Sequence, residues 1–131
     1  MTIFVNFAYM EDLIIIPTDK SLAVDISYGI LNFTGRSILT DPKVFFEPIL
    51  NWVNKYIKNP AEETVINIKL EYIDTASTQS LYQILRQLNG VRTKDFVLMI
   101  NWYIEDADPE MQELGEMIEQ RMGLDFQYVP Y

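Results

Sequence analysis

From Pro42 onwards, apolar residues recur at two alternating spacings, and this alternation limits the possible folds more than any other feature. Steps of three and four residues, which gather apolar side chains on one side of a helix, occur in 42–58, 76–89 and 109–122. Runs rich in β-branched and aromatic residues, as in strands, follow these segments at 64–73, 96–103 and 126–129. Strands that alternate with helices predict an α/β fold with a mostly parallel sheet.

The first part of the chain predicts an antiparallel addition to that sheet. Residues 13–16, 22–27 and 30–34 have strand-like patterns, and Tyr28-Gly29 predicts a tight hairpin turn. Gly35 would end the third of these strands. We therefore expect one domain over 1–131, an α/β layered fold with a mixed, mostly parallel central sheet, an N-terminal antiparallel hairpin and three helices. The continuous apolar run at 96–103 predicts a strand that is covered on both faces.

The helices have recognisable start and stop residues. Asp41-Pro42 and Asp108-Pro109 each combine an N-cap carboxylate with proline at the first helical position. Gly123 would end the last helix, because glycine readily adopts the left-handed conformation that closes a helix.

The residues that are missing exclude several classes of enzyme. None of the 131 residues is Cys or His, which excludes cysteine nucleophiles, imidazole bases and Cys/His zinc sites. No glycine motif for nucleotide phosphates occurs, and no cofactor is expected. The net charge of −9 disfavours nucleic acid and anionic membrane surfaces as partners. With no apolar run near the roughly 20 residues of a membrane span and no basic signal-peptide start, we expect a cytoplasmic protein.

The strongest local feature is the junction Asp74-Thr75, where a predicted buried strand ends and a helix begins. Ligands collect outside the carboxyl ends of strands in open α/β sheets, and free N–H groups at a helix start favour an anion. One interpretation is that Asp74 or Thr75 only caps the helix. The other is that Thr75 accepts a phosphate, with Ser77, Thr78 and Ser80 as the nearest alternatives.

Two further segments have open interpretations. Gly35-Arg36-Ser37 is either a turn with a solvated Arg or a contact to a partner or a phosphate. Residues 105–119 include seven acidic side chains and no basic one, which is typical of a solvated helix face. An alternative function is a carboxylate metal site, or a small enzyme, that uses Asp74, Asp106 and Asp108. A third is an acidic adaptor whose last helix binds a basic partner.

Three stretches together resemble the SiaC family of bacterial regulatory phosphoproteins, which is related in fold to the STAS-like anti-sigma-factor antagonists. Gly35-Arg36-Ser37 leads into 45–56, and Leu70-Glu71-Tyr72-Ile73-Asp74-Thr75-Ala76-Ser77 follows. Asn101-Trp102-Tyr103 then precedes the acidic segment 105–115. The resemblance covers about residues 10–129. Because family members begin close to the position of Met10, we expect residues 1–9 to be either an N-terminal extension or the product of a misplaced start codon.

The resemblance implies a partner switch that is not itself an enzyme. A protein kinase of the anti-sigma-factor type would phosphorylate a hydroxyl at the strand–helix junction, and a PP2C-type phosphatase would remove the phosphate. The phosphorylation state would decide which partner is bound, and in the namesake system that partner is a diguanylate cyclase of cyclic-di-GMP signalling. The acceptor of the family corresponds to Thr75, although Asp74 stands where the family usually has Asn.

The resemblance also suggests where the unmodified form would meet its partner. The surface around Thr75 would dock, and the candidate contacts are Arg36, Ser37, Asp74, Trp102, Tyr103, Asp106 and Asp108.

Overall fold

The predicted order of strands and helices is confirmed in a computed structural model, which describes residues 10–91 and 95–131. The strands are β1 (Leu13–Ile15), β2 (Ala23–Ser27), β3 (Ile30–Ser37), β4 (Glu63–Ile73), β5 (Val97–Ile104) and β6 (Gln127–Pro130). The helices are α1 (Pro42–Tyr56), α2 (Thr75–Asn89) and α3 (Pro109–Met122). No helix within these two described segments is long and apolar enough to cross a membrane. The expected extension at 1–9 lies outside the described residues.

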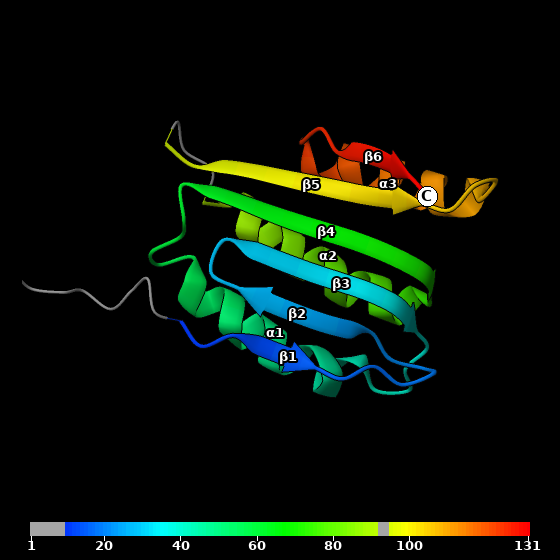
Figure 1. The fold of residues 1–131 in the computed structure, drawn as a ribbon, viewed down its shortest axis with the longest axis horizontal. Helices are drawn as coiled ribbons and strands as arrows, with labels where there is room; N and C mark the ends of the chain where they lie inside the picture. Colours follow the sequence, from blue (N-terminus) through cyan, green and yellow to red (C-terminus); the bar gives the residue numbers. More distant parts are fainter. Residues whose placement is uncertain (1–9, 92–94) are drawn as a thin grey trace, which may run out of the picture.

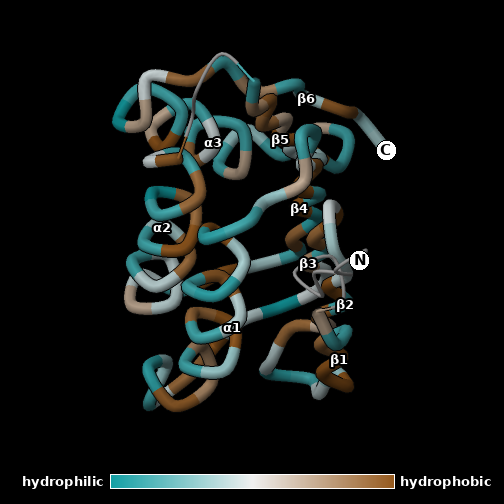
Figure 2. Tube along the Cα trace, turned by 90° about the vertical axis from the view of Figure 1, so that its left-hand side faces the viewer, coloured by the Kyte–Doolittle hydropathy of each residue, from teal (hydrophilic) through white to brown (hydrophobic). Residues whose placement is uncertain are grey.

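The six strands lie in the sheet in the order in which they occur in the chain (Figure 1). The pairs β1–β2 and β2–β3 are antiparallel, whereas β3–β4, β4–β5 and β5–β6 are parallel. Each parallel connection passes through a helix and advances in the same direction. Since such crossovers are nearly always right-handed, all three helices lie on one face of the sheet, as Figure 2 shows.

One face of the sheet is therefore left without a helix layer, and this corrects the expectation for 96–103. In β5, Leu98, Ile100 and Trp102 point into the core, but Val97 is 53% exposed. The strand is covered on one face only. Its apolar run continues because Met99 and Tyr103 on the open face are also apolar or aromatic, and both are half-buried.

A row of asparagines crosses the middle of the open face. Asn32, Asn67 and Asn101 are in register on β3, β4 and β5. The Asn67 amide donates to Asn32 Oδ1 at 2.9 Å, and the Asn101 amide donates to Asn67 Oδ1 at 2.9 Å. This ladder links the three parallel strands through their side chains and keeps the centre of the open face polar.

The core fills the space between the inner face of the sheet and the helices. Trp52 and Tyr56, which the helical spacing predicts as core residues, are buried on α1, whereas Phe45, which the same spacing predicts, is only half-buried. The neighbouring Phe46 is buried in its place. The ring of Trp52 stacks on that of Tyr56 at 4.9 Å between centroids. The hydroxyls of Tyr56 and Thr64 are hydrogen-bonded at 2.7 Å, so the polar atom of this buried tyrosine is satisfied.

One local prediction is wrong. Gly35 does not end its strand, because β3 continues to Ser37, and the register shifts between Gly35 and Arg36 since Glu71 is an extra residue on β4. The predicted start of α1 is confirmed, with Asp41 at the N-cap position and Pro42 as the first residue, although the Asp41 side chain makes no capping hydrogen bond. The other predicted ends are confirmed, since Asp108 caps α3 and Gly123 closes it with a φ of 66°.

Helix α3 approaches the sheet closely at Gly115. A Cβ atom at this position would lie 2.7 Å from Nε1 of Trp102. The indole is fully buried, and its N–H donates to the backbone oxygen of Met111 at 3.0 Å. Glycine at 115 thus allows α3 to rest directly on the Trp102 ring.

We predict that Gly115→Ala lowers the free energy of unfolding by about 1–3 kcal/mol, because the methyl group must displace a packed ring. Gly90→Ala is the control, since Gly90 has a φ of −67° and its added Cβ would have an ordinary contact of 3.4 Å to the Gln87 oxygen. It should leave stability unchanged or raise it by about 0.4–1 kcal/mol. Urea unfolding of both variants measures the difference, and equal stability of the Gly115 variant and the wild type would contradict the packing described.

Candidate functional site

The predicted junction lies at the edge of the sheet where β3 and β4 end. Strand β4 ends at Ile73 and α2 begins at Thr75, so Asp74 is the only residue between them. Thr75 is the first residue of the helix, and its side chain is exposed. The free backbone N–H groups of a helix start favour negative charge at this position.

Asp74 connects the start of α2 to the loop that follows β3. Its Oδ1 accepts the Ser77 N–H at 2.8 Å, which caps the helix, and its Oδ2 accepts the Leu39 N–H at 2.9 Å. The Ser37 hydroxyl donates to Ser77 Oγ at 2.8 Å. The Asp74 N–H donates to the backbone oxygen of Ser37 at 2.9 Å. We call Ser37, Leu39, Asp74 and Ser77 the Asp74 clamp.

The hydrogen bonds of the clamp favour the ionised carboxylate. Partial burial raises the pKa of Asp74, but the hydrogen bonds from Ser77 and Leu39 outweigh it. The pKa of Asp74 therefore lies below its ordinary value of 3.8. The carboxylate is charged at neutral pH and lies next to Thr75 in the chain.

The four hydroxyls named as possible phosphate acceptors differ in accessibility. Ser77 is fully buried within the clamp, so the structure contradicts it as an alternative acceptor. Thr78 is half-buried, and its hydroxyl donates to the backbone oxygen of Asp74 at 2.8 Å. Ser80 is half-buried beside α1, in a hollow that Phe46 and Leu50 also line. Thr75 is the exposed hydroxyl of the four.

Two of the predicted contact residues are in the core, and the prediction is wrong for both. Trp102 has no exposed surface because it points from β5 towards α3. Ser37 is also fully buried, since its hydroxyl is bonded inside the clamp. Arg36 is exposed and pairs in register with Tyr72, which is 49% exposed. Arg36 and Tyr72 therefore form a surface at the same sheet edge as Thr75.

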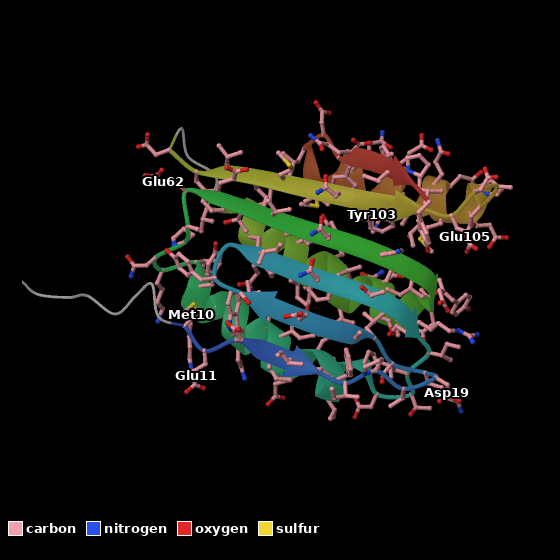
Figure 3. The ribbon with its side chains drawn as sticks, in the orientation of Figure 1. Met10, Glu11, Asp19, Glu62, Tyr103 and Glu105 are labelled. Atoms are coloured by element: carbon pink, nitrogen blue, oxygen red, sulfur yellow. The ribbon has the colours of Figure 1, made fainter. Side chains whose placement is uncertain are left out.

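The predicted contacts after β5 lie farther along this edge. Tyr103 is half-buried near the end of β5, and Glu105 is the first residue after that strand (Figure 3). Lys69 Nζ lies 5.9 Å from the ring centroid of Tyr103. Asp106 is exposed, whereas Asp108 accepts the Met111 N–H at 3.1 Å and caps α3.

The alternative hypothesis of a carboxylate metal site finds no support in this arrangement. Asp74 and Asp108 each serve as a helix cap. Among the residues that the structure describes, no three acidic side chains gather to hold a metal ion.

Sequence reasoning missed several residues of this region. The Leu39 N–H is a backbone group, and nothing in the side-chain pattern indicates its role. Tyr72 and Met117 are exposed. Met117 lies outside the predicted apolar stripe of the last helix, which consists of Met111, Leu114, Ile118 and Met122. An exposed methionine outside that stripe was a signal that the pattern offered.

We predict that Asp74 contributes to stability in a pH-dependent way. Because its pKa is lowered in the folded state, the contribution is present well above pH 3.8 and is lost as the pH falls through the folded-state pKa. Asp74→Asn keeps a capping oxygen but loses the charge, and should cost about 1 kcal/mol at pH 7 and less at pH 3. The exposed Asp106→Asn serves as control. Urea unfolding at pH 7, 5 and 3 measures both, and a pH-independent cost of Asp74→Asn would contradict the prediction.

Three comparisons with known proteins show which family and fold this chain shares. The model of the SiaC family regulatory phosphoproteins matches residues 18–131. An uncharacterized protein of Pseudomonas aeruginosa is 22% identical over 119 residues, covering 89% of this chain and 94% of that protein.

Among solved structures, SiaC of Pseudomonas aeruginosa has a TM-score of 0.79 at 21% identity, covering 93% of this chain and all of that one. The structure of the diguanylate cyclase SiaD in complex with its activator SiaC, from the same organism, has a TM-score of 0.83 at 20% identity. That match covers 92% of this chain and 100% of the other. At these low identities the solved structures establish only that the fold is shared. Family membership rests on the family model, which matches residues 18–131.

A member of this family is a regulatory protein and not an enzyme. The chain belongs to the SiaC family of regulatory phosphoproteins.

Proposed function

We propose that this chain is a partner switch that binds and activates a diguanylate cyclase, and that phosphorylation of Thr75 controls the binding. A kinase of the anti-sigma-factor type adds the phosphate from ATP, a PP2C-type phosphatase removes it, and both act in the cytoplasm. The unmodified form docks through the surface around Thr75.

The observation that carries this proposal is the exposed hydroxyl of Thr75 at the first position of α2. A kinase needs an accessible hydroxyl, and Thr75 is more accessible than Ser77, Thr78 and Ser80. The helix start also favours the product, because a phosphate carries roughly −1.5 to −2 charges and lies at the positive end of the helix dipole.

The neighbouring Asp74 gives the phosphate a way to change the surface. A phosphate on Thr75 would repel the Asp74 carboxylate, which holds the Leu39 N–H at 2.9 Å. Loss of that bond would release the loop after β3, where Ile38 is 39% exposed. Phosphorylation thus acts on the docking surface both directly, by its charge, and through the clamp.

The cyclase is supported as partner by the comparison with known structures. The SiaC protein that shares this fold is described as the activator of the diguanylate cyclase SiaD, with which it forms a complex. The proposal extends this pairing to the present chain and to the cyclase encoded in its own genome.

We predict that the cognate kinase and ATP place one phosphate on Thr75. Thr75→Ala should then incorporate none, whereas the half-buried Ser80→Ala should be phosphorylated like the wild type. Mass spectrometry of proteolytic fragments locates the phosphate, and its presence on another hydroxyl would contradict the assignment.

We also predict that Thr75→Glu accelerates hydrogen exchange at the Leu39 amide, since the added charge repels Asp74. The Met111 amide is the internal control, because Asp108 holds it at 3.1 Å in a similar cap without a neighbouring acceptor threonine. In an Asp74→Asn background the acceleration should disappear. Amide exchange followed by NMR measures it, and an unchanged Leu39 rate in Thr75→Glu would show that the clamp does not respond to charge at Thr75.

A further inference from the structure

The two edges of the sheet differ in how well they are protected against pairing with a further strand. Among the residues that the structure describes, β1 pairs only with β2 and β6 only with β5, so each has an outer side without a strand partner. Strand β6 ends in Pro130, which has no N–H to donate and is typical of a protected edge. Strand β1 is short, but it contains neither a proline nor a charged side chain. The edge at β1 is therefore the one that is open to another strand.

The most exposed large apolar side chains of the described segments gather on this side of the molecule. Ile16 is 76% exposed, Val44 is 68% exposed and Ile14 is 62% exposed, whereas Val97, which follows them, is 53% exposed. Ile14 belongs to β1 and Ile16 is the first residue after it. Val44 belongs to α1, the helix that lies beside β1 (Figure 1, Figure 2). Neighbouring exposed apolar side chains indicate an interaction surface, because covering them removes apolar area from water.

The outward side of α1 continues this surface. The Trp52 indole donates to the backbone oxygen of Glu11 at 2.8 Å, which connects α1 to the segment that leads into β1. Pro48 and Asn51 line the same hollow as residues 10–13, and both are exposed and uncharged. Val44 lies one turn before Pro48 and so on the same stripe of the helix. We call the following residues the lateral surface: Ile14, Ile16, Val44, Pro48 and Asn51.

The lateral surface is uncharged, although the chain has a net charge of −9. The acidic residues 105–119 lie at the opposite end of the sheet, beside β5 and β6 (Figure 1). Two copies of the chain repel each other in most orientations, because they carry the same charge. A contact through the lateral surface keeps the two acidic segments far apart. This surface is therefore suited to a second copy of the same chain.

We propose that two copies of this chain associate through β1, with the two β1 strands antiparallel about a two-fold axis at Ile14. Each β1 adds to the sheet of the other copy, and two six-stranded sheets become one continuous sheet. This register pairs every residue of β1: Ile14 lies opposite Ile14, and Leu13 lies opposite Ile15 of the second copy. Apolar cross-strand pairs stabilise a sheet. An axis at Ile15 would instead place two acidic residues, Glu11 and Asp19, opposite each other.

The register is tested by cross-linking, because the chain contains no cysteine and one substitution introduces a single thiol. Residues that lie opposite each other in antiparallel strands have Cα atoms about 4.5–5.5 Å apart, which permits a disulfide. Under a mild oxidant, Ile14→Cys should therefore become a covalent dimer. Val97→Cys, at an exposed position of β5, is the matched control and should stay monomeric. Equal cross-linking of both variants, or none of Ile14→Cys, would overturn the inference.

Sedimentation equilibrium of the full chain measures the contact without oxidation. Because β1 is short, we expect a weak dimer whose share rises from micromolar to millimolar concentration. Ile14→Lys should raise the dissociation constant of the dimer about tenfold or more, since a lysine on an edge strand opposes pairing. Val97→Lys should change it less than about twofold, and both variants should keep the wild-type melting temperature. Salt should strengthen the dimer, because it screens the repulsion between two acidic chains.

A chain that is monomeric at millimolar concentration would overturn the inference, and two measurements then identify what occupies the edge instead. Slow hydrogen exchange of the β1 amides in the monomer would show that the chain itself covers the edge. A loss of affinity for the diguanylate cyclase in Ile14→Lys would assign the edge to that partner. Either result contradicts pairing between two copies and leaves the proposed function as it stands.

Discussion

The direction of the three crossovers is the constraint on which the rest of the structure depends. Because β3, β4, β5 and β6 are added in chain order, every connecting helix lies on the same face of the sheet. The strand ends and helix starts of β4–α2 and β5–α3 then lie along one edge, with Thr75 and Pro109 as the first helical residues. The opposite face has no helix layer and is crossed by the ladder of Asn32, Asn67 and Asn101.

At that edge, one carboxylate connects Thr75, the proposed switch residue, to its surroundings. Asp74 caps α2 through Ser77 and holds the loop after β3 through Leu39. A charge placed on Thr75 therefore acts on a bonded network and not on an isolated side chain. Thr75 also lines a hollow between α2 and α3, together with Leu114 and Met117 of α3.

Much of the fold follows from local patterns in the sequence, but the burial of each residue does not. Helical spacing and the Asp-Pro and Gly signals predict the three helices. The strand–helix junction indicates Thr75 as a candidate phosphate acceptor and Asp74 as a candidate helix cap. The continuous apolar run at 96–103 cannot tell whether one face or both are covered, because that depends on the side taken by the crossovers. The resemblance suggests Trp102 as a partner contact, but the residue is in the core, where Gly115 rests on it. The role of Leu39 depends on a backbone N–H that long-range packing brings to Asp74, and no sequence pattern reports it.

The central claim is that the phosphate on Thr75 decides whether the chain activates its partner. The most direct test is the rate at which the diguanylate cyclase from the same genome forms cyclic-di-GMP in the presence of the unmodified chain or of the fully phosphorylated chain. The account predicts stimulation by the unmodified chain and none by the phosphorylated one. Equal stimulation by both forms would contradict it.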